Sequence, residues 1–152
     1  MRFAFTLLLL APLAAPAQTK DEKEVLAAVQ MMFDGMAAHS AEKLQAATAV
    51  NAQFFAMAGD QARLITRDGF VQSNATNKLA ALERIWEPKV RIRGAIADVW
   101  AEYDYHRDGK FHHCGIDAFQ LVKDAGTWKI VSVIWTTETE GCKPSPLGAP
   151  KP

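Results

Sequence analysis

Three observations predict an α+β fold in which amino-terminal helices pack on an antiparallel sheet. Apolar residues between Val25 and Met36 recur every three or four positions, as they do along one face of a helix. From Val90 onward apolar residues alternate with polar ones, which is the period of a strand. Two junctions that end in glycine, 107–109 and 124–126, divide this stretch into strands joined by hairpin loops.

The elements can be placed in order along the chain. Thr19 with Glu22, or Asp21 with Glu24, can form a capping box that opens the first helix, and the apolar stripe continues to Ala38. We expect helices at 19–38, 41–47 and 69–78, and strands at 53–57, 63–66, 90–106, 110–123 and 127–139.

Composition limits the class of protein. The chain has 152 residues, of which 49% are hydrophobic and 22% charged, so it has enough apolar sequence for one core and is not intrinsically disordered. Lys and Arg number 17 and Asp and Glu number 17, with no basic run. Because phosphate binding requires clustered positive charge, no nucleic-acid partner is expected.

Residues 1–17 have the pattern of a secretory signal peptide. Arg2 precedes a short apolar run, and small residues at Ala15 and Ala17 predict cleavage after Ala17. The alternative is a membrane anchor, but the run is shorter than the ~18–20 apolar residues that span a bilayer, and Pro12 interrupts it. We therefore expect a periplasmic or secreted protein without a membrane span.

Export affects the interpretation of the two cysteines, Cys114 and Cys142. In an oxidising compartment a disulfide is expected, and its loop of about 29 residues would stabilise the fold by roughly 3–4 kcal/mol. The alternative pairs Cys114 with His112 or His113 as a metal or nucleophile site. The spacing of a zinc site is absent, so no metal and no cofactor are expected.

Loop length predicts which strand residues face each other. Three-residue loops would place His106 opposite Lys110 and Lys123 opposite Thr127. One face of the sheet would then carry Ala97, Val99, Ala101, Tyr103, Tyr105, His113, Gly115, Asp117, Phe119, Leu121, Val131, Val133, Trp135 and Thr137. The other would carry Asp98, Trp100, Glu102, Cys114, Ile116, Ala118, Gln120, Val122, Trp128, Ile130 and Ile134. The helices can cover only one of these two partly apolar faces, which predicts a homodimer through the sheet.

The carboxyl half of the chain carries a family resemblance. Its motifs are 99–103 (VWAEY), 108–110 (DGK), 113–121 (HCGIDAFQL), 126–130 (GTWKI) and 141–142 (GC). In this order they resemble the nuclear-transport-factor-2-like (NTF2-like) superfamily, including small exported members grouped as putative lumazine-binding proteins. The resemblance implies that residues 18–142 form a cone, with helices in a curved antiparallel sheet, an internal pocket and frequent dimerisation. It does not imply one chemistry. The tail at 143–152, with four prolines, is predicted to be disordered.

Asp117 is the first candidate for chemistry. It is expected in mid-strand on the pocket face, among aliphatic and aromatic neighbours that raise its pKa and favour the neutral acid. A neutral carboxyl group can donate a hydrogen bond to an oxyanion, and 116–119 resembles the strand that carries such an acid in ketosteroid isomerases. Their tyrosine and carboxylate base have no counterparts in 31–33 and 54–57, so ketosteroid isomerisation is not expected. The alternative is an Asp117 that only shapes the pocket.

His113 and Tyr103 are the other candidate catalytic residues. They are expected to be cross-strand neighbours, and His113 lies roughly 13 Å from Asp117 along the strand. They could act on two ends of one substrate, with His113 as base and Asp117 as acid. The alternative is a histidine hydrogen-bonded to Tyr103 at the pocket rim.

Aromatic and apolar residues predict what the pocket holds. They could form the wall for a flat ligand, or they could be simple core. The expected lining consists of Met32, Phe54, Trp86, Val99, Tyr105, Phe119 and Trp135. The sequence thus predicts an exported dimer that binds a small, largely apolar molecule without turning it over. The alternative is a cofactor-free lyase, isomerase or cyclase that uses Asp117, His113 and Tyr103.

Overall fold

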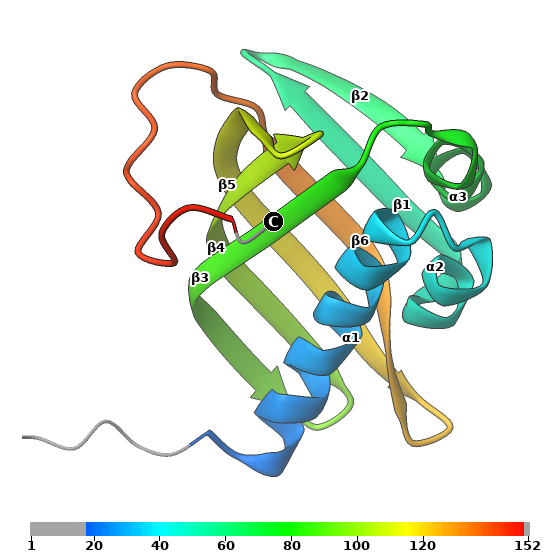
Figure 1. Cartoon of the computed structure of the whole chain (residues 1–152). Helices are drawn as coiled ribbons and strands as arrows, with labels where there is room; N and C mark the ends of the chain where they lie inside the picture. The colour runs from blue at the N-terminus through cyan, green and yellow to red at the C-terminus, as the bar shows by residue number, and fades with distance from the viewer. Residues whose placement is uncertain (1–17, 151–152) are drawn as a thin grey trace, which may run out of the picture.

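A computed structural model describes residues 18–150, so the predicted signal peptide lies outside the described residues. Three helices and six strands follow one another (Figure 1). They are α1 (Lys20–Ala37), α2 (Ala41–Ala47), β1 (Thr48–Ala58), β2 (Gln61–Thr66), α3 (Arg67–Thr76), β3 (Ala81–Arg93), β4 (Ile96–Arg107), β5 (Lys110–Asp124) and β6 (Thr127–Thr136). Within residues 18–150, no helix is both long enough and apolar enough to cross a membrane.

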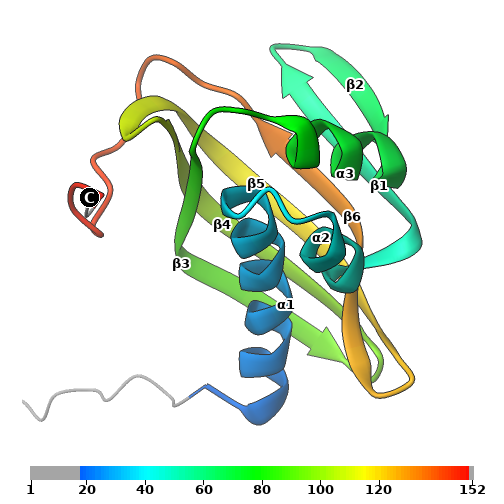
Figure 2. The ribbon, with the colours of Figure 1, turned by 45° about the vertical axis from the view of Figure 1, so that its right-hand side comes forward.

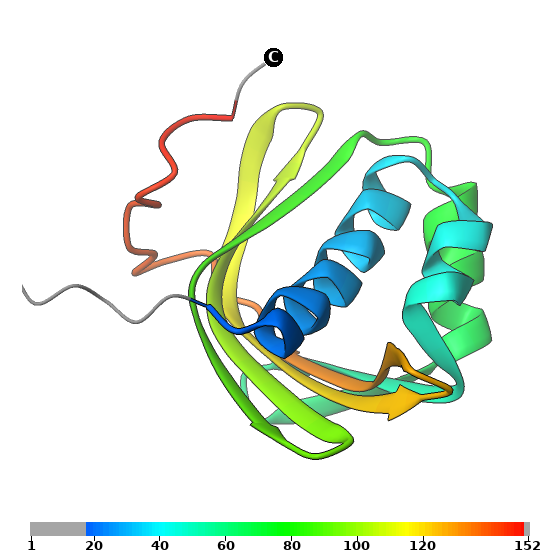
Figure 3. The same ribbon diagram turned by 90° about the horizontal axis from the view of Figure 1, so that it is seen from below.

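The predicted α+β architecture is confirmed. The six strands form one sheet in the order β2-β1-β6-β5-β4-β3, in which only β1 and β6 run parallel. The sheet is curved and unclosed, and α1 lies in its hollow (Figure 3). The capping box of Thr19 and Glu22 opens α1, which then buries Val25, Val29 and Phe33 against the concave face.

The predicted strand 90–106 is wrong, because two strands occupy this stretch. β3 and β4 meet in a hairpin where Arg93 pairs with Ile96. The sequence indicates this hairpin because the apolar residues change from even-numbered positions before the loop to odd-numbered positions after it. Ile92 faces the same side as Ala97, so even positions before the loop share a face with odd positions after it.

The two predicted hairpin loops contain two residues rather than three. Arg107 pairs with Lys110, and Asp124 pairs with Thr127. Both residues of each loop have positive φ, as in the type I′ turn that suits the twist of a hairpin. Glycine occupies the second position of each loop, where it adopts this conformation without strain.

A β-bulge compensates for the shorter loop between β4 and β5. The register shifts after His106 and Phe111, so that Tyr105 pairs with His113. The shorter loop alone would have exchanged the two faces, and the extra residue in β5 restores them. The odd-numbered side chains of β4, and those of β5 from His113 onward, therefore share the concave face as predicted. Asp117 lies opposite Ala101, whereas three-residue loops would have placed it opposite Val99.

A second bulge changes the predicted faces of β6. Leu121 pairs with Ile130 and Gln120 with Ser132, which leaves Val131 as the extra residue. Trp128 and Ile130 therefore lie on the concave side and belong to the core, contrary to the prediction that placed them on the other face. Val133 and Trp135 keep their predicted side, and Trp135 pairs with Asp117.

The segment after β6 is attached to β5 and then covers part of the outer face of the sheet. Cys114 and Glu138 exchange two backbone hydrogen bonds, and Cys114 forms the predicted disulfide with Cys142. Residues 143–150 contain no helix or strand and run along the outside (Figures 2 and 3). There Lys143 pairs with Glu102 at 2.6 Å, and Arg84 donates a hydrogen bond to the Gly148 carbonyl oxygen.

Candidate functional site

A cavity of about 830 Å³ lies between the helices and one half of the concave face. Its walls are largely apolar, with Met32 and Met36 from α1 and the stacked rings of Phe54 and Phe70, whose centroids are 4.1 Å apart. The strands contribute polar groups. Among the residues predicted from the sequence, the cavity is lined by Met32, Phe54, Tyr103, Tyr105, His113, Asp117 and Trp135.

Three residues predicted to line the pocket do not do so. Val99 and Phe119 lie in the other half of the concave face, where Phe119 meets the edge of Phe33 at 6.0 Å and α1 leaves no room for a ligand. Trp86 pairs with Glu102 and lies on the outer side of the sheet, beside Cys142. The missed β3–β4 hairpin explains this error, because only that pairing fixes the side to which Trp86 belongs.

The structure adds a second carboxyl group, that of Glu83, to the predicted Asp117. Glu83 lies on β3 opposite Tyr105 and lines the same cavity. Sequence reasoning missed it because the first half of β3 was not recognised as a strand. A strand at 81–93 paired with β4 would have placed Glu83 on the concave face.

The carboxyl groups of Glu83 and Asp117 both line the cavity, and each affects the pKa of the other. Burial, the charge of Glu83 and a hydrogen bond to Glu83 all raise the pKa of Asp117, so Asp117 is the neutral partner and the donor. Burial raises the pKa of Glu83 to about 7, while the hydrogen bond from Asp117 opposes the rise and the charge of Asp104 adds to it. The pair thus carries at most one negative charge near neutral pH.

The carboxyl pair has unused acceptor capacity. Within residues 18–150, no amide or hydroxyl group donates a hydrogen bond to Asp117 Oδ2, which is fully buried, and Asp117 as a whole is only 2% exposed. Buried acceptors of this kind are rare in folded proteins and need an explanation. A ligand with hydrogen-bond donors would satisfy them.

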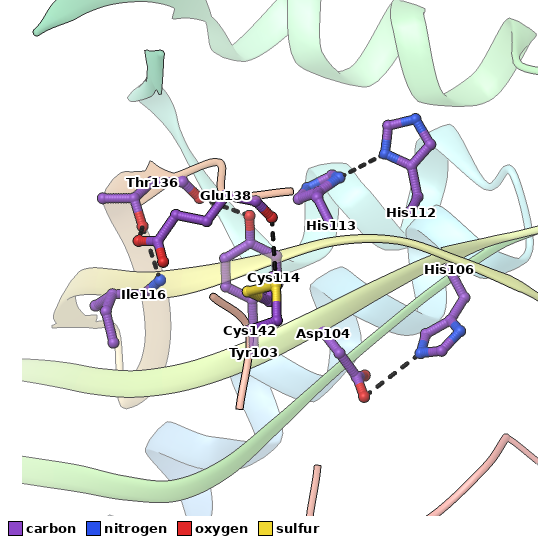
Figure 4. The surroundings of a disulfide bond; sticks show 10 residues. All are labelled: Tyr103, Asp104, His106, His112, His113, Cys114, Ile116, Thr136, Glu138 and Cys142. Atoms are coloured by element: carbon purple, nitrogen blue, oxygen red, sulfur yellow. Dashed lines mark hydrogen bonds and ion pairs between the residues drawn. A yellow bond between two sulfur atoms is a disulfide. The ribbon is translucent and has the colours of Figure 1, made fainter. Parts of the chain in front are cut away.

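The Tyr103 hydroxyl is hydrogen-bonded to the end of β6. Its hydroxyl donates a hydrogen bond to the Thr136 carbonyl oxygen at 2.7 Å (Figure 4), and burial raises its pKa. Gly115 makes this contact possible, since a Cβ there would lie 2.4 Å from the same oxygen and 2.9 Å from the Tyr103 ring. The hydroxyl proton is therefore engaged, and only its oxygen lone pairs remain for a ligand.

His113 is held among other rings near the cavity mouth. It packs on Tyr105 with ring centroids 4.9 Å apart, and its Nδ1 lies 2.7 Å from Nδ1 of His112 (Figure 4). Burial first, and then the charges of His112 and Arg107, lower its pKa to about 4, so that it is neutral near pH 7. The hydrogen bond between His113 and Tyr103 that we considered is absent, since Tyr103 bonds to Thr136 instead.

Basic side chains line the exposed part of the cavity, here called its mouth, whereas Glu83 and Asp117 form its acidic floor. Arg63 from β2 and Arg107 from β4 line the cavity and are exposed, as is His112. Neither arginine forms an ion pair in the part of the chain that the structure describes. Across that same part, no cluster of three or more His, Cys, Asp or Glu side chains is placed to hold a metal ion.

An open α+β cone that holds a large cavity is the fold of NTF2-like proteins. The sequence matches the family model described as putative lumazine-binding over residues 20–136, and the chain belongs to this family. The resemblance inferred from the motifs is thereby confirmed. No curated protein matches the sequence.

Solved structures with this fold are similar in shape and distant in sequence. A protein of unknown function with a cystatin-like fold from Nostoc punctiforme has a TM-score of 0.68 at 11% identity, covering 80% of this chain and 95% of the other. An NTF2-like protein of unknown function from Shewanella baltica has a TM-score of 0.62 at 19% identity, covering 82% and 100%. A putative dehydratase of the NTF2-like family from Streptomyces avermitilis has a TM-score of 0.62 at 13% identity, covering 77% and 95%.

Proposed function

We propose that this protein is an exported, dimeric carrier of a small, largely apolar molecule that it binds without turning over. The observation that carries the proposal is the cavity itself, which is lined by aromatic and thioether side chains and is large enough for a ligand of one or two rings. The family description names lumazine, a flat bicyclic molecule, and stacked aromatic walls are suited to such a shape.

Ligand titration tests this proposal. Tryptophan fluorescence would be followed while lumazine or the neutral ketone 2-acetonaphthone is added. We expect saturable binding of at least one of them at one site per chain, weakened about tenfold by Trp135→Ala, which removes a cavity wall. The matched control is Trp100→Ala, because Trp100 is 55% exposed outside the cavity. If neither molecule binds and native mass spectrometry finds no ligand on protein from its own compartment, the proposal is wrong.

The outer face of the sheet supports a homodimer. Side chains directly opposite one another on five neighbouring strands form an apolar row across it, and Trp100, Ile134 and Leu64 in this row are 55%, 43% and 54% exposed. The row consists of Leu64, Phe55, Ile134, Ala118 and Trp100. Monomeric proteins rarely expose such contiguous patches.

Sedimentation velocity tests the dimer. We expect a dimer at micromolar concentration, dissociated by Trp100→Glu, which buries an unpaired charge if the face is covered. Phe111→Glu is the control, since Phe111 is also half exposed but lies near a hairpin loop. A monomeric wild-type protein would contradict the dimer and leave the cavity proposal intact.

The disulfide supports export, because such bonds persist in oxidising compartments. Expression of the full chain followed by fractionation tests this step. We expect the protein in the periplasm or medium, with an amino terminus at Gln18 by mass spectrometry. An unprocessed chain in the cytoplasmic fraction would contradict it.

Glu83 favours one alternative, a cofactor-free lyase, isomerase or cyclase. A carboxylate with a pKa of about 7 can accept a proton from carbon beside a carbonyl group. Once Glu83 is protonated, the proton of the neutral Asp117 no longer bonds to a carboxylate and can bond to the enolate oxygen. His113 and Tyr103 would then position the substrate. The test is deuterium exchange into the methyl group of 2-acetonaphthone, followed by NMR. Enzyme-dependent exchange that Glu83→Gln abolishes would establish proton transfer and replace the carrier proposal.

A further inference from the structure

We propose that the ligand of this cavity has two polar ends: an amidine-like N–H donor group for the Glu83–Asp117 pair, and a carboxylate or phosphate for Arg63 and Arg107 at the mouth. This inference rests on the proposed function, since it names the chemical class of the molecule that the cavity binds. It specifies that the apolar part of this ligand lies between two polar ends.

The carboxyl groups at the floor of the cavity indicate the chemistry of the first end of the ligand. Asp117 and Glu83 both line the cavity and have four carboxyl oxygens between them, so with only Asp117 protonated the floor has more acceptors than donors. Tyr103 offers no proton, because its hydroxyl is bonded to the Thr136 carbonyl oxygen. Asp117 Oδ2 is buried and receives no N–H or hydroxyl donor within residues 18–150. An amidinium group supplies parallel N–H donors and a compensating positive charge.

The arginines at the mouth of the cavity indicate the chemistry of the second end of the ligand. Arg63 lies on β2 and Arg107 on β4, and both residues line the cavity and are exposed. The Arg107 guanidinium lies 5.5 Å from the centre of the Tyr105 ring, which also lines the cavity. Arg67, Arg84 and Arg91 pair with Asp68, Asp104 and Asp98, whereas Arg63 and Arg107 have no such partner in the described part of the chain. An anionic group on the ligand would provide one.

Strand geometry sets the length of the ligand. Glu83 lies opposite Tyr105, and Arg107 is two residues further along β4, a separation of roughly 7 Å in an extended strand. A rigid bicyclic ring substituted at its two ends spans about this distance. The apolar wall between the two polar zones, formed by Phe54, Phe70 and Trp135, would contact the ring.

Four naphthalene probes test the proposal by calorimetry. They are 6-amidino-2-naphthoate with both ends, 2-naphthamidine and 2-naphthoate with one end each, and 2-acetonaphthone with neither. We expect the two-ended probe to bind at least about tenfold more tightly than either one-ended probe, because each end gains a charge-assisted hydrogen bond. Equal affinity for all four probes would overturn this inference and leave the carrier proposal standing. Failure of all four to bind would also overturn this inference, and lumazine titration with native mass spectrometry would then decide the carrier proposal.

Variants assign each end to its residues. Glu83→Gln should remove the advantage of the amidine and leave that of the carboxylate, and Arg63→Gln with Arg107→Gln should do the reverse. The controls are Glu42→Gln on α2 and Arg93→Gln on the outer face, which change the same charges outside the cavity lining. Should Glu83→Gln fail to fold, Asp117→Asn serves for the floor. Retention of both advantages in the folded variants would overturn the proposal.

Discussion

The two halves of the concave face are built from the same strands, and they differ in what covers them. In one half, Phe119, Leu121 and Ile130 are at most 1% exposed and pack beneath α1. In the other half, Tyr103 and Asp117 are equally buried, but the side chains around them border a cavity of about 830 Å³. Helix α1 crosses the hollow of the sheet obliquely (Figure 3).

This difference separates stability from ligand chemistry. The filled half buries apolar surface and stabilises the fold. The open half holds the buried carboxyl group of Asp117 and the half-buried one of Glu83, which opposes folding unless a proton or a ligand donor compensates. Substitutions in the first half should therefore change the free energy of unfolding, and those in the second should change binding and pH dependence.

The largest effect is expected in the filled half. Phe119→Ala should lower the free energy of unfolding by about 3–5 kcal/mol, because a buried aromatic ring is replaced by a cavity. Urea unfolding measures this, and probe affinity of the folded fraction should not change. The control is Phe111→Ala, which changes a half-exposed ring and should cost less than about 0.5 kcal/mol. A loss of probe affinity in Phe119→Ala would contradict the separation of the two halves.

The next effect concerns the carboxyl pair. The pKa of Glu83 is raised to about 7 from an unfolded value of 4.5, so the folded state binds the extra proton. Its contribution to stability is present below pH 4.5 and lost as the pH rises through 7. Glu83→Gln should therefore be more stable than the wild type at pH 8, by roughly 2 kcal/mol, and should not differ in this way at pH 4.

Unfolding by urea across this pH range measures the difference between the two proteins. The lowered pKa of His113 acts in the opposite direction, removing stability as the pH falls from 6.5 towards 4, and it is common to both proteins. A constant difference at all pH values would show that Glu83 does not titrate with a raised pKa.

Gly115 allows close packing between β5, the Tyr103 ring and the end of β6. Gly115→Ala should cost about 1–3 kcal/mol, because its Cβ would press on the Thr136 carbonyl oxygen and on the Tyr103 ring. Tyr103→Phe keeps the ring and removes only the hydroxyl, so a smaller loss of about 1 kcal/mol is expected. Thermal unfolding measures the loss of stability in each variant. Equal losses would contradict the larger effect expected from the close packing at Gly115.

The smallest effect lies far from the cavity, in the β5–β6 loop. Ala125 has a φ of 45°, which disfavours alanine, whereas Asn before Gly is preferred in a type I′ turn. Ala125→Asn should raise stability by about 1 kcal/mol and the melting temperature by a few degrees. Asp108→Asn at the matching position of the β4–β5 loop should change little, since Asp already tolerates this conformation.

Local rules predicted much of the fold. The stripe from Val25 to Met36 gave α1 correctly, and the glycine-ended junctions located two hairpins. The prediction for β4 and β5 survived an error in loop length, because the bulge in β5 restored the faces. The same error in β6 displaced Trp128 and Ile130, since its bulge came at Val131. A bulge is one extra residue in one strand, and no local sequence pattern predicted the bulge in β5 or the one in β6.

The candidate site was also predicted only in part from the sequence. Asp117 could be placed in the hollow from alternation along one strand. Its partner Glu83 is 34 residues away in the chain and could not be recognised without the β3–β4 pairing. Trp86 was misplaced for the same reason, and the commitment of Tyr103 to Thr136 depends on the position of β6.

By itself, the sequence determined the helices, the hairpins and the presence of an acid on the inner face, because these follow from periodicity and from the backbone conformations that glycine allows. Only the tertiary structure decided which half of the hollow stays open and which carboxyl groups meet there. Those features depend on strand pairing and on the path of α1 across the sheet, where residues distant in the chain compete for the same space.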